Sequence, residues 1–222
     1  EFDDNWDGIM ENINHSSNLA GNSIFEQNRP ERNKQMIGIL GNTGWYKSNV
    51  TVTLNSQDEI NGSGILKTEY SLDNGQTVNT YTEPLTVSEE KINKLKFRSI
   101  DNAGNEEDPK EMKIKIDKTP PKVTIDASPK TLWPANNKMI DVKITGSSFD
   151  ANLLNTRIIV SDEYHKIEPL ITGFGQTIQL QASRNGDDMD GRKYTIKAIA
   201  EDLAGNTAQA LTEVIVPHDQ RK

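Results

Sequence analysis

Cysteine is absent from the 222 residues of the chain, and aromatic residues make up only 6% of them. Without thiols, disulfide scaffolds, thiolate metal sites and cysteine nucleophiles are excluded. No apolar run approaches the roughly 20 residues that a membrane-spanning helix needs, so we expect no membrane insertion. Hydrophobic residues reach only 33%, which predicts thin cores, as in sandwiches whose sheets each keep one face in water.

Positive charge is also in short supply, because 25 Lys and Arg stand against 33 Asp and Glu, which gives a net charge of −8. An acidic surface repels phosphate backbones, and we therefore expect no nucleic-acid partner. The same charge argues against binding to anionic membrane surfaces. It suits calcium, whose preferred ligands are carboxylate and carbonyl oxygens.

Motifs of the common enzyme classes are missing. His15, His165 and His218 lie far apart, and neither an H-E-x-x-H nor a G-x-S-x-G pattern occurs. The glycine-rich run 38–44 lacks the Lys-Ser/Thr of a phosphate-binding loop, and we interpret it as a flexible joint. Carboxylates are abundant, yet nothing selects a pair for glycoside hydrolysis. We therefore expect a protein without catalytic activity.

Short alternating runs fill two zones of the chain. In the first zone, Val50, Val52 and Leu54 alternate with polar residues, which predicts a half-buried strand. Asn74-Gly75 follows another run and indicates a hairpin turn, because this pair tolerates positive φ. The runs that predict strands cover residues 49–54, 65–72, 84–87, 95–100 and 112–116 in the first zone, and 123–125, 139–144, 157–160, 177–181, 194–200 and 208–216 in the second.

One five-residue motif occurs in both zones. Asp-x-Ala-Gly-Asn stands at 101–105 and again at 202–206, each time between the last two predicted strands. A spacing of about 100 residues corresponds to one sandwich domain. The segment 117–121, Asp-Lys-Thr-Pro-Pro, separates the zones, and its two prolines predict a short, stiff and extended connection.

These patterns predict an all-β protein made of two tandem Ig-like β-sandwiches with an irregular N-terminal extension. Residues 1–44 form the extension, which carries a candidate calcium loop. Residues 45–118 form the first sandwich and residues 119–222 the second. Because the connection is too short for free tumbling, we expect a semi-rigid rod of two modules.

Two parts of the chain resemble known modules. Residues 44–125, with Gly-Trp-Tyr at 44–46 and the motifs at 69–73, 101–105 and 117–121, resemble a bacterial Ig-like repeat, the β repeat first named from a leptospiral outer-membrane protein. Residues 132–139 and 216–220 are similar to a second Ig-like module found near the ends of large secreted proteins. The resemblance implies spacer, stalk or adhesive units beside other domains of a prokaryotic protein.

The start of the chain is rich in oxygen ligands and fits the calcium-loop pattern D-x-[DN]-x-[DN]-G. Gly8 permits the sharp turn that such a loop needs. The candidate ligands are side-chain or backbone oxygens of Asp3, Asn5, Asp7, Ile9, Glu11 and Asn14. Asn14 stands where an acidic bidentate residue is expected, so a solvated acidic terminus is the alternative interpretation.

Asp101 and Asp202 each allow two interpretations. Either aspartate can accept backbone N–H bonds at the start of a turn in which the following glycine takes positive φ. Either can also act as a calcium ligand between modules, and Asp117 at the junction could join such a site. The sequence favours the turn role.

The tryptophans divide into core and surface candidates. Trp45 starts a module and is expected in its core, because a buried aromatic ring fills a sandwich well. Trp133 lies before Pro134 near a module edge and is the candidate ligand-binding residue, since an exposed ring can stack on the apolar face of a sugar.

We expect non-catalytic structural or adhesive stalk modules of a secreted or cell-surface protein, whose partners are the neighbouring domains of a larger chain. One alternative is an accessory carbohydrate-binding module of a secreted hydrolase, with a glycan bound at Trp133. Another is the self-associating subunit of an extracellular filament. In that case residues 36–40 are the best candidate for an added strand at an exposed sheet edge.

Overall fold

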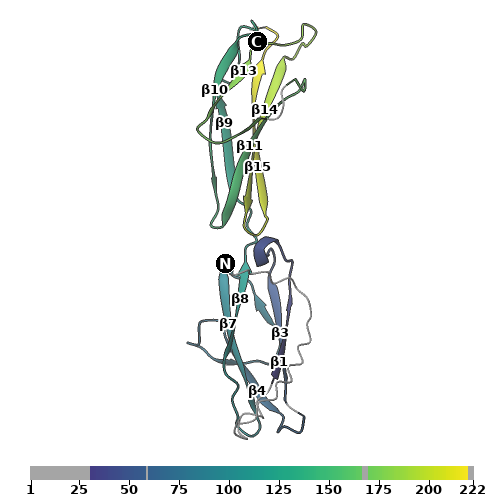
Figure 1. The fold of residues 1–222 in the computed structure, drawn as a ribbon, viewed down its shortest axis with the longest axis vertical. Helices are drawn as coiled ribbons and strands as arrows, with labels where there is room; N and C mark the ends of the chain where they lie inside the picture. Colours follow the sequence, from purple (N-terminus) through teal and green to yellow (C-terminus); the bar gives the residue numbers. More distant parts are fainter. Residues whose placement is uncertain (1–30, 59, 167–169, 220–222) are drawn as a thin grey trace, which may run out of the picture.

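The computed structural model describes residues 31–58, 60–166 and 170–219. Within these residues strands dominate, and the helical structure consists of one short 3-10 turn, η1 (Asn42–Gly44). The strands form two stacks that follow one another along the long axis of the molecule (Figure 1). The predicted all-β class is confirmed. Across the same residues, no helix has the length and apolarity needed to cross a membrane.

Module 1, residues 31–117, is a sandwich of two sheets with strand orders β1-β3-β6 and β2-β8-β7-β4-β5. Hydrogen-bonded neighbours are antiparallel except β2 and β8, which run parallel. The strands are β1 (Glu31–Ile37), β2 (Trp45–Tyr46), β3 (Val50–Gln57), β4 (Ile65–Ser71), β5 (Asn79–Thr80), β6 (Leu85–Val87), β7 (Ile92–Asp101) and β8 (Lys110–Ile116).

The core of module 1 follows from alternation along its strands. Val50, Val52 and Leu54 of β3 are buried, as the sequence predicts, and they pack in one cluster with Leu95 and Ile114 of the opposite sheet. Successive side chains of a strand point to opposite faces, so the intervening polar residues lie on the outer surface. Each sheet therefore has one dry and one wet face.

Module 2, residues 122–219, is a second sandwich with strand orders β13-β10-β9 and β12-β11-β14-β15. Its own core includes Val142, Ile158, Ile196 and Val214. The strands are β9 (Lys122–Ser128), β10 (Met139–Phe149), β11 (Leu153–Asp162), β12 (Leu170–Thr172), β13 (Thr177–Gln181), β14 (Arg192–Asp202) and β15 (Thr207–Val216). The two modules thus have separate cores.

Strand β1 corrects one expectation from the sequence. It lies inside the segment 1–44 that was expected to be irregular, yet it pairs with β3 from Glu31 opposite Gln57 to Ile37 opposite Thr51. The segment 31–37 is mostly polar and poor in β-branched residues, so its own pattern gives no strand signal. The free edge of β3 supplies the hydrogen bonds. Module 1 therefore starts at β1 and not at residue 45, and β1 covers a sheet edge of its own chain.

Candidate metal centre at the module junction

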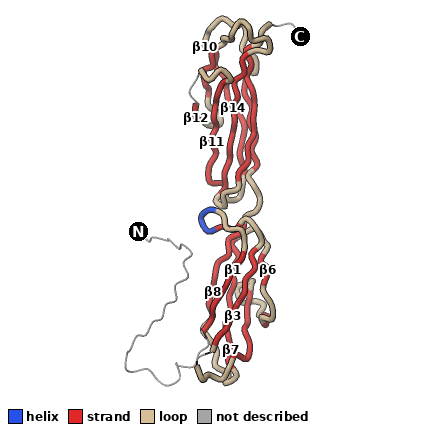
Figure 2. The backbone as a smooth tube through the Cα atoms, turned by 90° about the vertical axis from the view of Figure 1, so that its right-hand side faces the viewer, coloured by secondary structure: helices blue, strands red, loops and turns tan. Residues whose placement is uncertain are grey.

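The turn η1 lies at the boundary between the modules, where Figure 2 shows it as the blue segment between the two stacks of strands. The backbone N–H of Asn42 donates to the carbonyl of Ala204 at 2.9 Å. The hydroxyl of Thr43 donates to the carbonyl of Leu203 at 2.8 Å. Module 1 therefore binds the β14–β15 turn of module 2 directly.

Two glycines allow this close approach. A Cβ atom at Gly41 would lie 2.2 Å from the carbonyl oxygen of Ala204. A Cβ atom at Gly205 would lie 2.6 Å from the side-chain nitrogen of Asn42, and Gly205 has a φ of +82°. The run 38–44, which the sequence analysis interprets as a flexible joint, is instead a bonded part of the interface.

Asp117 follows β8 directly and is held from both sides of the boundary. Its N–H donates to the carbonyl of Tyr46 in module 1 at 2.9 Å. From module 2, the side-chain amide of Asn152 donates to its Oδ2 at 2.6 Å, and that of Asn206 donates to its backbone carbonyl at 3.0 Å. The linker residue is thus a structural part of both modules.

Three carboxylates converge at this point, from Asp117 in the linker, Asp150 after β10 and Asp202 at the end of β14. One carboxylate oxygen of each lies within 4.8 Å of the others. Asp117 is 4% exposed and Asp202 is 0% exposed. Among the described residues, no lysine, arginine or histidine forms an ion pair with any of the three.

This arrangement disfavours the charged form of Asp117. Burial raises the pKa of its carboxyl above the ordinary value, and the charges of Asp202 and Asp150 act in the same direction, against the hydrogen bond from Asn152. A bound cation would instead favour the charged form of Asp117, because it stabilises all three anions together. A cluster made of oxygen ligands alone suits a hard cation such as calcium, which binds several carboxylate and carbonyl oxygens, better than zinc.

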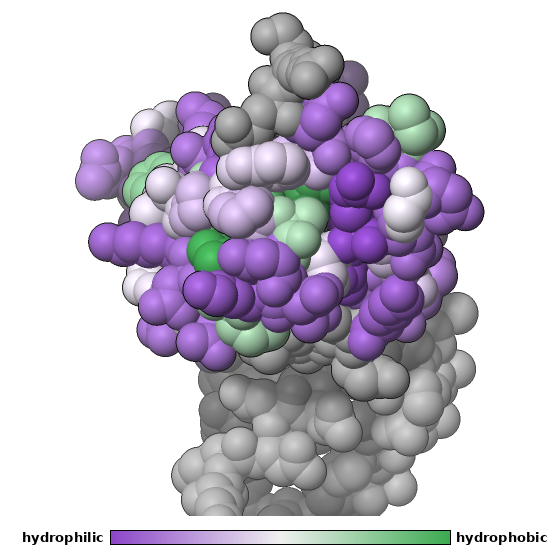
Figure 3. All heavy atoms as spheres, turned by 90° about the horizontal axis from the view of Figure 1, so that it is seen from above, coloured by the Kyte–Doolittle hydropathy of each residue, from purple (hydrophilic) through white to green (hydrophobic). Residues whose placement is uncertain are grey.

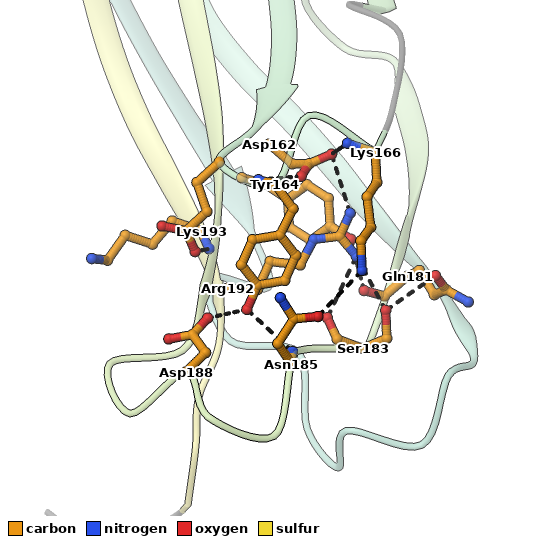
Figure 4. Close-up of polar contacts among 11 residues, drawn as sticks. Asp162, Tyr164, Lys166, Gln181, Ser183, Asn185, Asp188, Arg192 and Lys193 are labelled. Atoms are coloured by element: carbon orange, nitrogen blue, oxygen red, sulfur yellow. Dashed lines mark hydrogen bonds and ion pairs between the residues drawn. The ribbon is translucent and has the colours of Figure 1, made fainter.

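Another buried aspartate of module 2 has a protein cation as its partner. At the end remote from the junction, Arg192 lies 3.1 Å from Asp162, with side chains 2% and 0% exposed. The guanidinium carbon also lies 5.2 Å from the ring centre of Tyr164 and 4.5 Å from that of Tyr194. Figure 4 shows the guanidinium of Arg192 between Asp162 and Ser183. Module 2 thus neutralises one buried aspartate with an arginine, whereas the described residues supply no basic side chain to the three carboxylates of the junction.

The predicted site residues fall into three groups. Asp101 and Asp202 have the predicted turn role, since each accepts the backbone N–H of the asparagine four residues later, at 2.8 and 2.9 Å. The structure also brings Asp202 and Asp117 together. The candidate calcium ligands Asp3, Asn5, Asp7, Ile9, Glu11 and Asn14 lie outside the described residues.

Trp45 and Trp133 occupy different environments. Trp45 is buried in module 1, as predicted, whereas Trp133 is 40% exposed in the connection between β9 and β10. Figure 3 views the molecule from the end of module 2 and shows a mainly hydrophilic surface with small apolar areas. Trp133 is therefore accessible to a ligand and does not belong to the junction.

Sequence reasoning missed Asp150 and the two amides of Asn152 and Asn206. Asp150 lies in no motif, and its role depends on where β10 ends. Asn206 closes the repeated motif, so its turn role was visible, but its bond to Asp117 was not. The buried pair of Asp162 and Arg192 gave no signal, because single charged residues at strand ends are usually solvated.

No family model and no curated protein sequence matches the chain. Among solved structures, it is similar to the fibronectin(III)-like modules of CbhA from Clostridium thermocellum. The identity is 13% and the TM-score 0.33, over 83% of this chain and 94% of that one.

Two further structures are similar at the same level. The three N-terminal domains of the outer capsid protein Hoc of bacteriophage RB49 match with 14% identity and a TM-score of 0.32, over 85% of this chain and 59% of that one. A tetra-tandem repeat in the extending region of a large adhesion protein matches with 15% identity and a TM-score of 0.31, over 85% of this chain and 50% of that one. This chain thus spans less than two thirds of both.

Proposed function

We propose that the chain is a non-catalytic stalk segment, in which two Ig-like modules hold a fixed relative orientation within an extracellular or cell-surface protein that carries further domains. The junction is the observation that supports this most strongly. Asn42 donates from module 1 to module 2, and Asn206 donates in the opposite direction to Asp117. A linker bonded to both modules transmits orientation, whereas a free linker allows the domains to tumble.

We further propose that calcium binds at the junction between Asp117, Asp150 and Asp202. Three carboxylates with oxygen atoms within 4.8 Å repel one another unless a cation lies between them. Two of the three come from module 2 and one from the linker, so a shared ion would tie the modules together. Calcium is the class of ion favoured by this ligand chemistry and by the net charge of −8.

Scattering and orientation measurements test both parts of the proposal. We expect small-angle X-ray scattering to show one extended particle, and residual dipolar couplings to show a narrower range of module orientations when calcium is added. Asp150→Asn should abolish the calcium effect, whereas Asp187→Asn, an exposed residue in the β13–β14 connection, should not.

The possible outcomes separate the two parts. A broad range of module orientations with and without calcium would overturn the stalk. A narrow range that is indifferent to calcium and to Asp150→Asn would leave the stalk standing and remove the metal site. Calcium bound at the N-terminal loop, from Asp3 to Asn14, is a further part of the proposal, and the change Asp7→Ala distinguishes that loop from the junction.

A second candidate function rests on Trp133, whose side chain is 40% exposed. An exposed indole offers a flat apolar face on which a sugar ring can stack. Binding of an insoluble polysaccharide that is lost in Trp133→Ala would favour an accessory carbohydrate-binding role. The same assay on Met189→Ala, which removes another exposed apolar side chain, is the matched control.

The resemblance of module 1 to one particular family of Ig-like repeats is also part of the proposal. The motifs in residues 44–125 suggest that module 1 is a bacterial Ig-like repeat of the leptospiral type. This resemblance implies a spacer, stalk or adhesive unit, which agrees with a stalk role.

A further inference from the structure

The end of module 1 that points away from the junction repeats the loops with which module 2 binds module 1. In module 2, the β14–β15 turn begins with Asp202, whose two carboxylate oxygens accept the backbone and side-chain N–H of Asn206, both at 2.9 Å. In module 1, Asp101 begins the β7–β8 connection and accepts the same two groups of Asn105, both at 2.8 Å. The two turns are therefore equivalent.

A second carboxylate is repeated as well. Asp58 directly follows β3, and Asp150 directly follows β10. Asp58 accepts the N–H of Gly64 at 2.6 Å, and Asp150 accepts the N–H of Asn152 at 2.7 Å. Gly64 and Asn152 each immediately precede the next strand, although the connection in module 1 is longer. Two different loops thus place a carboxylate in the same local position.

The backbone between the two loops also matches. The N–H of Asn102 donates to the carbonyl of Gly64 at 2.9 Å. The N–H of Leu203 donates to the carbonyl of Asn152 at 2.8 Å. The loop that carries the second carboxylate is therefore joined to the repeated turn in the same way in both modules.

The chain also enters both modules at the same place. In module 2, Lys122 begins β9 and lies opposite Phe149, the last residue of β10. In module 1, Glu31 begins β1 and lies opposite Gln57, the last residue of β3. A module attached before β1 would arrive at module 1 from the position that module 1 itself takes on module 2.

The junction end of module 2 and the equivalent end of module 1 differ in whether another module is bound there. Ala204 is 0% exposed, and its carbonyl accepts the N–H of Asn42 from module 1. Its counterpart Ala103 is exposed. Within the described part of the chain, no donor is bonded to the carbonyl of Ala103 or of Asn102. One end thus shows a closed joint, and the other shows the same turn and backbone bonds without a partner module among the described residues, although Gly64 lacks the side-chain amide with which Asn152 binds Asp117.

We propose that this end of module 1, formed around Asp58, Gly64, Asp101 and Asn105, is a docking surface for the Asp-bearing end of another module of the same kind as module 1. The inference rests on the proposed function of the junction, which it extends to a second joint. The partner needs an aspartate directly after its last strand and a turn like Gly41-Asn42-Thr43, because these groups form the joint that is already present.

The partner is not the C-terminal end of a second copy of this chain. After β15 the sequence continues with Pro217, which is at the position that Asp117 holds after β8. The Asp117 end of a second copy is already bonded to its own module 2. The chain on its own is therefore expected to be monomeric, and the docking surface is expected to serve a module within the same polypeptide.

A chain with a duplicated module 1 tests the proposal, namely residues 31–121 followed directly by residues 31–222. Each copy of module 1 has its own core, so the extra copy brings what it needs to fold. We expect two calcium ions bound where residues 31–222 alone bind one. We also expect spin labels on the two copies of module 1 to report a single narrow distance, as labels on module 1 and module 2 do.

The same substitution placed in either copy is the matched control. Asp101→Asn in the second copy faces the new joint, and it should remove one calcium ion and broaden the distance between the two copies. Asp101→Asn in the first copy faces no module. It should change neither the number of bound calcium ions nor the distance between the two copies. Equal effects in both copies would reveal a folding defect of the turn and would overturn the proposal.

The label pair across the junction with module 2 separates this inference from the proposed function. A narrow distance there, together with a broad distance between the two copies of module 1, would overturn the docking surface and leave the stalk intact. Broad distances at both joints would overturn both. Concentration-dependent association of residues 31–222 would contradict the choice of partner.

Discussion

The side-chain amide of Asn206 donates to the backbone carbonyl of Asp117 at 3.0 Å, so a turn of module 2 binds the residue at which module 1 ends. The same amide group donates to the carboxylate of Asp202, which orients it. One asparagine therefore serves both the turn of its own module and the joint.

Asn206→Ala is the first prediction. The loss of a partly buried hydrogen bond across the junction and of the side-chain bond to Asp202 should lower the stability of module 2 by about 1–2 kcal/mol and widen the range of module orientations. Asn105→Ala removes the equivalent side-chain turn bond of module 1 without touching the joint. Residual dipolar couplings should therefore change in the first variant and not in the second, and equal changes would contradict the role of Asn206.

The pH dependence of Asp117 is the second prediction. Burial and the carboxylates of Asp202 and Asp150 raise the pKa of Asp117 in the folded chain. The folded state then takes up the proton at a higher pH than the unfolded state. Without calcium, this contribution to stability is present in full below the unfolded pKa and is lost as the pH rises through the folded pKa.

Asp117→Asn isolates this effect, because the amide stays neutral. Urea unfolding without calcium should show the variant gaining stability relative to the unchanged chain as the pH rises from about 4 to about 7. Saturating calcium should reverse the order, since the ion needs the ionised carboxylate. A difference that is independent of both pH and calcium would show that Asp117 bears no unfavourable charge.

The buried pair of Asp162 and Arg192 leads to the third prediction. Arg192→Ala leaves the Asp162 carboxylate buried without a cation, and module 2 should lose about 3–5 kcal/mol of stability. Replacing both residues, with Asp162→Asn and Arg192→Met, should recover part of the loss. Lys193→Ala, which breaks an ion pair with the exposed Asp190, should cost less than about 1 kcal/mol in the same denaturant titration.

The separate cores lead to the fourth prediction. Leu95→Ala creates a cavity in the fully buried core of module 1 and should destabilise that module by about 2–5 kcal/mol. Leu72→Ala removes a side chain that is exposed, and it should have a small effect. Calorimetry should show the unfolding transition of module 1 shifting to lower temperature while the transition of module 2 stays unchanged. A common shift of both transitions would mean that the two modules unfold as one unit.

Much of the fold was readable from local patterns. Alternation at Val50, Val52 and Leu54 predicted β3, because the side-chain period of a strand matches the period of burial. The strand β1 was not readable, since a polar segment becomes a strand when a free edge offers it hydrogen bonds. The buried state of Arg192 was hidden for a similar reason, as its partner Asp162 and the ring of Tyr164 come from another segment of the chain.

The sequence by itself determined the strands with alternating patterns, the two-module division and the repeated Asp-x-Ala-Gly-Asn turn, because each depends on residues close together in the chain. Only the tertiary structure decided that Asp117, Asp150 and Asp202 meet, and that the turn of one module closes on the linker of the other. Their convergence depends on where strands end and how two modules stack. Such distances are set by long-range packing, which no local pattern records.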